Sequence, residues 1–164
     1  MKKSIIILLF LGFIFGFANA QTPRAVSIEL LGVYNLAGIS FDSRFTENSK
    51  FGYKVGAGYG FGRFTAFFEY KSRTVAVPAN IYYLFGKKHH FFELGLGMTS
   101  FYYNRYFYDG IYGQESRFAG IGSYGFLQTA YRFESSKFLI SAGLDFVIQT
   151  PVIIRSKVSI GYRL

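Results

Sequence analysis

The chain has 164 residues, of which 51% are hydrophobic, 21% aromatic and only 16% charged, and its formal net charge is +9. This composition excludes a disordered protein. The absence of cysteine excludes a disulfide framework and a cysteine-ligated zinc site. The length indicates a single domain.

The first 20 residues have the layout of a secretory signal peptide. A positive head, "MKK", precedes an uncharged apolar run, "SIIILLFLGFIFGF", and "ANA" then supplies the small residues that a signal peptidase reads. An N-terminal membrane anchor is the alternative, but the apolar run is short and ends in this small-x-small site. We therefore predict a signal peptide over residues 1–20 and a mature domain over 21–164.

The mature chain alternates between apolar and polar residues almost throughout, which is the period of a β-strand. Charges and glycines interrupt every later apolar run before it reaches the roughly 20 residues that a membrane-spanning helix needs. The alternation predicts eight strands. In chain order they cover residues 26–34, 38–45, 51–61, 75–85, 91–102, 123–133, 138–148 and 152–164.

The predicted connections alternate in length. Short polar turns lie at 46–50, 86–90 and 134–137, whereas two longer loops cover 62–74 and 103–122. Short turns at one end and longer loops at the other are typical of bacterial outer-membrane barrels, with both termini on the periplasmic side. We predict an all-β, eight-stranded, antiparallel up-and-down transmembrane barrel.

Two segments complicate this prediction. Pro78 lies inside the fourth strand, where it removes a ladder hydrogen bond and indicates a bulge. The segment 63–73 also alternates, so it either prolongs a hairpin above the membrane or supplies further strands to a ten-stranded barrel. We favour the prolonged hairpin.

The polar face is the reason to prefer a membrane barrel over a soluble one. A soluble lipocalin-like barrel also alternates, with its apolar side chains inside, but here the polar face is rich in glycine, which a wet strand face disfavours and a cramped interior accommodates. Aromatic residues flank the short turns, as an interfacial girdle requires. Charges of both signs share the polar face and are expected to form a structural network in the lumen: Glu29, Asp42, Arg44, Lys54, Glu93, Arg132, Asp145, Arg155, Lys157 and Arg163.

The architecture resembles the small outer-membrane barrels typified by the OmpA membrane domain and OmpX. The string "VPANIYYLFGKKHHFFELGLG" (77–97) is similar in particular to segments of small Bacteroidota barrels. The resemblance implies an integral protein of the outer membrane of a Gram-negative bacterium. It also implies insertion by the barrel-assembly machinery, whose C-terminal signal is matched by the alternating Ile160, Tyr162 and Leu164, although such signals typically end in phenylalanine.

No catalytic, cofactor or metal site is predicted. "GAGYGFG" (56–62) lacks the G-x-G-x-x-G spacing of a nucleotide loop, and no helix pattern follows it. His89 and His90 are adjacent, so in an extended chain they point to opposite faces and chelate one metal poorly. They also lie at the end opposite to the one where lipid A-modifying barrels act, which disfavours that enzymatic alternative. A narrow small-solute channel is the other alternative, although eight strands enclose an interior that side chains just fill.

The long loops offer a possible contact surface at the cell exterior. Their basic residues are suited to lipopolysaccharide phosphates or, as the alternative, to an adhesive partner. The positive charge is scattered, which argues against nucleic-acid binding. We expect a monomer with a structural or surface-contact role. The candidate surface residues are Arg63, Lys71, Arg73, Arg105 and Arg117.

Overall fold

The chain forms a closed barrel of eight antiparallel strands in which each strand pairs with its neighbours in sequence and β1 pairs with β8. The computed structural model describes residues 22–34, 36–65, 68–109 and 114–164, so the predicted signal peptide lies outside the described residues. The up-and-down prediction is confirmed, and the ten-stranded alternative is wrong. The strands are β1 (Arg24–Leu31), β2 (Ala37–Arg44), β3 (Phe51–Thr65), β4 (Phe68–Lys87), β5 (His90–Asp109), β6 (Gln114–Glu134), β7 (Phe138–Ile148) and β8 (Ile153–Arg163).

Most of the large apolar residues point away from the barrel axis and most of the polar and charged residues point into it, although Leu84, Phe126 and Val147 are buried inside. In β1, Val26, Ile28 and Leu30 are exposed while Ser27 and Glu29 are buried. Every strand continues this alternation because successive side chains of an extended chain point to opposite faces. The barrel therefore has an apolar exterior and a charged, polar interior, which is the reverse of a soluble barrel. Among the described residues, no helix is long and apolar enough to cross a bilayer.

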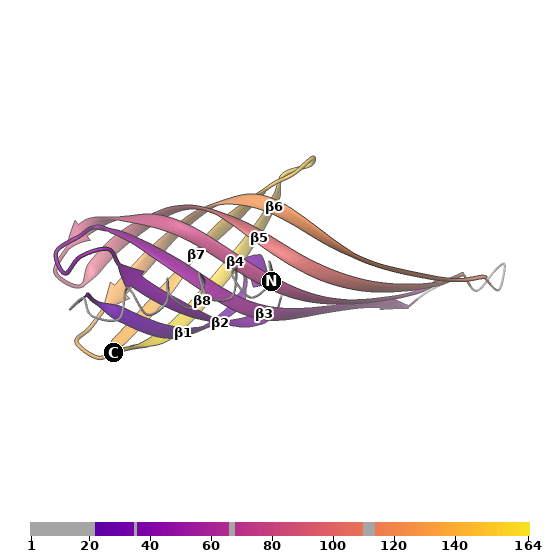
Figure 1. Cartoon of the computed structure of the whole chain (residues 1–164), viewed down its shortest axis with the longest axis horizontal. Coiled ribbons are helices and arrows are strands. Elements are labelled where there is room, and N and C mark those ends of the chain that lie inside the picture. Colours follow the sequence, from indigo (N-terminus) through magenta and orange to yellow (C-terminus); the bar gives the residue numbers. More distant parts are fainter. Residues whose placement is uncertain (1–21, 35, 66–67, 110–113) are drawn as a thin grey trace, which may run out of the picture.

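The two ends of the barrel differ in length. The turns between β2 and β3, β4 and β5, and β6 and β7 lie with the C-terminus at one end, on the left of Figure 1. At the other end, β3, β4, β5 and β6 continue far beyond their neighbours as a narrow four-stranded sheet, which we call the extension (Figure 1).

The extension corrects the expectation of long loops. Residues 62–65 and 68–74 belong to β3 and β4, and they pair from Gly62↔Ser72 to Thr65↔Glu69. Residues 103–109 and 114–122 likewise continue β5 and β6 in unbroken register. Hairpin pairing satisfies the backbone polar groups of these segments, which is why they remain strands outside the barrel. The prolonged hairpin expected over 63–73 is confirmed, whereas residues 103–109 and 114–122, expected to lie in a loop, are instead paired strands.

Pro78 does not produce the expected bulge. Pairing between β3 and β4 is interrupted between Val55↔Ala79 and Gly58↔Ala76, but the register is the same on both sides of the gap. On its other side Pro78 pairs normally with Thr99 of β5. The missing N–H thus removes one step of the ladder without inserting an extra residue, and the barrel stays closed through β5.

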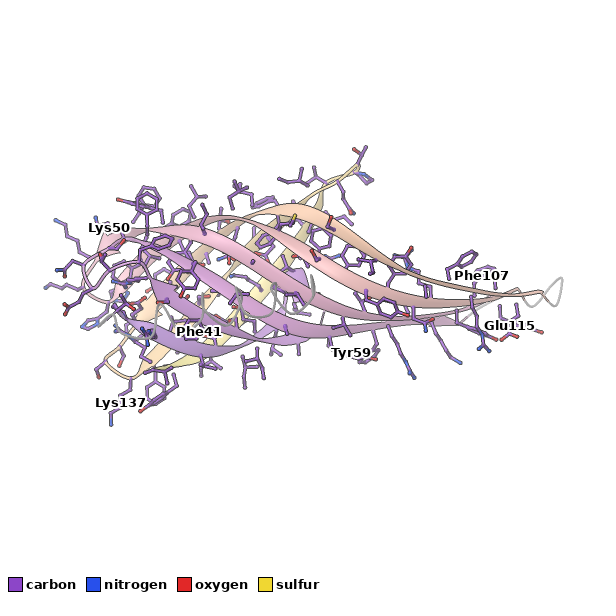
Figure 2. The ribbon with its side chains drawn as sticks, viewed as in Figure 1. Phe41, Lys50, Tyr59, Phe107, Glu115 and Lys137 are labelled. Carbon is purple, nitrogen blue, oxygen red and sulfur yellow. The ribbon has the colours of Figure 1, made fainter. Side chains whose placement is uncertain are left out.

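Aromatic side chains border the apolar exterior at both ends. Phe45 and Phe51, Phe85 and Phe92, and Phe138 flank the short turns and are exposed. Tyr59, Phe61 and Tyr102 are exposed at the opposite border. Figure 2 shows Tyr59 on the outer surface where the extension leaves the barrel. This arrangement is that of two interfacial girdles.

Candidate functional site

The interior is organised around Arg132 of β6. Its guanidinium lies 2.7 Å from an oxygen of Asp42, 3.0 Å from Glu93 and, through Nε, 2.7 Å from Glu134. It also lies over the ring of Tyr82, 5.1 Å from the centroid, and the Tyr82 hydroxyl donates to Asp42 at 2.6 Å. All of these side chains are buried. A buried arginine with this many acceptors has its hydrogen-bonding capacity used by the protein itself.

Two lysines continue this network towards the end of the barrel that carries the extension, which we call the outer end. Lys54 Nζ lies 3.3 Å from Glu29, 3.6 Å from Glu93 and 4.0 Å from Asp42. Lys157 Nζ lies 3.9 Å from the other oxygen of Glu29. The acidic groups are thus shared between cations from opposite walls, which cross-links the strands through the lumen.

Towards the turn end, Glu134 joins three arginines. Arg44 approaches it at 2.5 Å and Arg163 at 3.9 Å, in addition to Arg132. Glu134 is the last residue of β6, whereas the sequence predicts it in the turn at 134–137, so it is absent from the predicted lumen charges. Its position two residues after Arg132 places both side chains on the same strand face, and this spacing was the available signal.

Neutral polar residues complete the interior, and the sequence analysis did not single them out. Asn80 donates to Gln128 at 3.3 Å, and Gln128 donates to Glu93. Ser40 donates to Glu29 at 2.6 Å. Gln128 and Ser40 thus occupy further acceptor positions of Glu93 and Glu29, and side chains fill this part of the lumen.

Glycines make room for the large interior side chains. A Cβ added at Gly52 would lie 2.3 Å from the Tyr82 hydroxyl, and one added at Gly97 would lie 2.6 Å from the Phe126 ring. The glycine-rich polar face of the sequence therefore has a packing cause, since each large ring lies over a residue without a side chain.

The outer end of the barrel is covered from within by the connection between β1 and β2. It contains the short 3-10 helix η1 (Gly32–Tyr34), which contacts β1, β3, β4, β7 and β8. The Val33 amide donates to Asp145 at 3.1 Å, and its carbonyl accepts from Tyr124 at 3.0 Å. The Val33 side chain is buried against Phe126. We call this segment the plug, because it occupies the mouth through which a solute would enter.

The ten predicted lumen charges fall into two groups in the structure. Two of the outermost are held through the plug, since Asp145 binds the Val33 amide and Arg155 donates to the Gly32 carbonyl at 3.4 Å and to Tyr124 at 3.3 Å. The other eight belong to the ion-pair network around Arg132, Lys54 and Glu134. They are Glu29, Asp42, Arg44, Lys54, Glu93, Arg132, Lys157 and Arg163.

The predicted surface cations divide between the two faces of the extension. Lys71, Arg73 and Arg117 line one pocket on the outward face together with Asn104 and Tyr106. Arg105 lies over Tyr103 instead, 4.6 Å from its centroid, on the opposite face by strand alternation. Arg63 pairs with Lys71 in the register, but its side chain lies outside the described part of the structure.

Glu115 pairs with one of these cations near the tip of the extension. Arg117 approaches its carboxylate at 3.1 Å, and both side chains are exposed. The hydrogen bond from Arg117, together with one from Tyr106, lowers the pKa of Glu115 below the ordinary glutamate value. Glu115 therefore stays charged at every pH near neutrality, and it competes with any other anion for Arg117.

The two histidines bind different neighbours. His89 Nδ1 lies 2.7 Å from the carbonyl oxygen of Glu134, and His90 Nδ1 lies 2.5 Å from the Tyr131 hydroxyl. Within the described ranges, no group of three or more histidine, aspartate or glutamate side chains is arranged to hold a metal ion.

Three solved structures from outer membranes share this architecture. A major outer membrane protein of Thermus thermophilus matches with a TM-score of 0.65 at 9% identity, over 88% of this chain and 100% of that one. The N-terminal barrel domain of OprF from Pseudomonas aeruginosa matches at 0.53 and 7% identity, over 87% and 96%. The attachment invasion locus protein Ail of Yersinia pestis matches at 0.51 and 12% identity, over 87% and 97%.

The chain has the fold of the small outer-membrane β-barrels. No family model matches it, and no curated protein matches its sequence. At 7 to 12% identity the small outer-membrane barrels above share the fold alone with this chain. The fold resemblance drawn from the sequence is confirmed, while the closeness to Bacteroidota barrels stays a prediction.

Proposed function

We propose that this chain is an integral outer-membrane barrel of a Gram-negative bacterium with a structural and surface-contact role. The observation that carries the proposal is the orientation of the side chains. A belt of exposed large apolar residues surrounds a lumen of buried ions. In water such an exterior drives association, whereas in a bilayer it is solvated by lipid and the closed ladder leaves no unpaired edge.

The interior supports a structural role in preference to a channel. Charged side chains from opposite walls pair across the lumen, and the plug covers the outer end. A solute path would require these pairs to separate inside the barrel, which leaves uncompensated buried charges. We accordingly assign the charge network to stability of the barrel.

The extension supports the surface-contact role. It carries strands β3 to β6 beyond the outer girdle and presents basic and aromatic side chains there (Figure 2). Such side chains are suited to anionic groups of the outer leaflet or of an external partner. Insertion by the barrel-assembly machinery and a monomeric state complete the proposal, and no nucleic-acid partner is included.

Cell fractionation combined with gel migration tests this proposal. The full chain should be found in the outer-membrane fraction and should migrate differently before and after boiling, since a folded barrel resists detergent until heated. A product recovered as soluble periplasmic protein contradicts the proposal. For the interior, purified barrel in planar bilayers should give no steady unitary current.

A further inference from the structure

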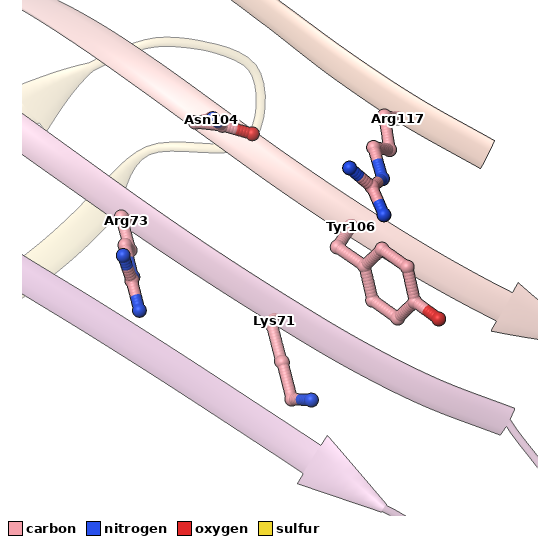
Figure 3. Close-up of a pocket in the computed structure, with 5 residues that line it drawn as sticks. All are labelled: Lys71, Arg73, Asn104, Tyr106 and Arg117. Carbon is pink, nitrogen blue, oxygen red and sulfur yellow. The ribbon is translucent and has the colours of Figure 1, made fainter. Parts of the chain in front are cut away.

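The outward face of the extension carries its basic side chains in register. Lys71 of β4 lies beside Tyr106 of β5, which lies beside Arg117 of β6. In the next row towards the barrel, Arg73 lies beside Asn104. These five residues line a pocket of about 270 Å³, which we call the basic pocket. Figure 3 shows Lys71 and Arg117 on the two sides of Tyr106.

The chemistry of the basic pocket is that of an anion site. Lys71 Nζ lies 5.5 Å from the Tyr106 centroid and Arg117 Cζ lies 5.6 Å from it, so one ring orients both cations. Arg73 and Asn104 add further N–H donors from the two adjacent strands. Several donors on three strands suit a group with several anionic oxygens, such as a phosphate monoester.

The height of the basic pocket above the apolar belt narrows the choice of ligand. The last row of the exterior in which every residue is apolar or aromatic consists of Tyr59, Val75, Tyr102 and Ile121, and in the next row the exposed Phe61 lies beside Arg73. Arg117 lies four residues beyond Ile121 on β6, which is about 13 Å along the strand and about 10 Å in height at a tilt near 45°. Arg73 lies half as far beyond Val75. The headgroup layer of a bilayer extends about 5–8 Å beyond the hydrocarbon, so Arg73 lies within this layer and Arg117 lies just beyond its outer edge.

An acidic residue lies in the row beyond the basic pocket. Glu115 of β6 pairs with Tyr108 in the register, and its side chain is exposed. A soluble polyanion that approaches from the tip meets this carboxylate first, whereas a headgroup approaches from the membrane side, where the neighbouring residues are neutral. The order of rows therefore favours a lipid over a soluble anion.

We propose that the basic pocket binds the phosphate of a phosphorylated glycolipid of the outer leaflet, of the lipid A type. This inference rests on the proposed function, since it requires the apolar belt to lie in the outer membrane. Lys71, Arg73 and Arg117 bind the phosphate oxygens, and Tyr106 positions Lys71 and Arg117 around them. The lipid thereby fixes the extension at a defined height on the membrane surface.

Native mass spectrometry of the full chain in detergent micelles tests the proposal. The folded barrel is titrated with bisphosphorylated lipid A and, in parallel, with dephosphorylated lipid A. Each of Lys71→Gln, Arg73→Gln and Arg117→Gln should weaken binding of the phosphorylated lipid about fivefold, the usual effect of one basic residue at a membrane surface. Glu115→Gln should strengthen binding, because it removes the carboxylate that occupies Arg117.

Arg105→Gln is the matched control. Arg105 belongs to the same extension and also lies over a tyrosine, but on the opposite face. Its substitution should leave lipid A binding unchanged. The shift between boiled and unboiled samples on a gel verifies that each variant is folded.

Three results overturn the proposal. The first is equal binding of the dephosphorylated lipid, and the second is a loss with Arg105→Gln equal to the loss with Arg117→Gln. The third is that a soluble sulfated oligosaccharide displaces lipid A from the wild-type protein and binds it with the same affinity as lipid A does. If lipid A does not bind, the proposed outer-membrane location still stands. If the chain is recovered as a soluble periplasmic protein, the proposed location is wrong even when lipid A binds in micelles. The two proposals can therefore fail separately.

Discussion

At the scale of single residues, the interior is a problem of volume as much as of charge. Eight strands enclose a space that side chains just fill, and here that space must hold several arginines, lysines and carboxylates. Tyr82 illustrates the solution, because its ring lies directly over Gly52 while its hydroxyl binds Asp42. The contact between Tyr82 and Asp42 thus depends on residue 52 having no side chain.

Gly52→Ala should destabilise the barrel by roughly 1–3 kcal/mol, the usual cost of overpacking. The added methyl would lie 2.3 Å from the Tyr82 oxygen and 2.7 Å from the backbone oxygen of Ser43, so Tyr82 must move and weaken its bond to Asp42. The measurement is the urea midpoint at which the folded, heat-modifiable band disappears. Gly62→Ala is the control, because its nearest neighbour would lie at an ordinary 3.9 Å. Equal midpoints for the two variants would contradict this packing argument.

At the scale of elements, the connection between β1 and β2 differs from a simple hairpin turn, because it folds into the barrel. Leu31 and Gly32 both have positive φ, 64° and 59°, which turns the chain into the barrel mouth. Gly32 adopts this conformation at little cost, whereas Leu31 does so because the contacts of η1 compensate for the strain. The plug is therefore held by Asp145, Tyr124 and the barrel wall.

Removal of the plug should open the outer end of the lumen to water. Thr99 is fully buried and pairs with Tyr124, which binds the plug. The chain contains no cysteine, so Thr99→Cys provides a single thiol whose reaction with a small charged methanethiosulfonate reports access. The reaction should be slow in the otherwise native protein. It should become much faster when residues 31–36 are replaced by Asn-Gly, which closes a two-residue hairpin.

The control for the plug experiment is Tyr108→Cys, at an exposed position on the extension. Its rate of modification should be the same with and without the plug. A rate at position 99 that is unaffected by the replacement would show that the plug does not cover the lumen.

At the scale of the whole molecule, the barrel has an apolar exterior suited to lipid, and the extension has a polar surface suited to water and headgroups. Strands β1, β2, β7 and β8 end near the outer girdle, whereas β3 to β6 continue past it (Figure 1). The outward face consequently changes from apolar at Ile81 to basic at Lys71 along β4, and from apolar at Leu127 to basic at Arg117 along β6. This change of chemistry marks the expected outer surface of the membrane.

Spin labels on single cysteines should map this boundary. Labels at Val55 and Leu96, both on the apolar exterior, should be accessible to oxygen dissolved in lipid and protected from a water-soluble nickel complex. A label at Tyr108 on the extension should show the opposite preference. Water accessibility at positions 55 and 96 would contradict the membrane orientation proposed for the barrel.

The strand number, the order of pairing and the two faces could all be predicted from the sequence. These features follow from alternation and from turn spacing, which are local properties of the chain, and β7 was predicted with the observed bounds of 138–148. The sequence also predicts which side chains point into the lumen, because alternate residues of a strand lie on opposite faces.

The contacts between interior side chains, in contrast, depend on how the closed barrel brings distant strands together. Glu134, Tyr82 and Gln128 join the charge network through contacts between strands far apart in sequence, and no local pattern contains those pairings. The same holds for the plug, whose direction depends on the barrel wall around it. The separation of Arg105 from Lys71 and Arg117 followed once residues 103–109 and 114–122 proved to be strands, since only a paired strand gives each side chain a fixed face.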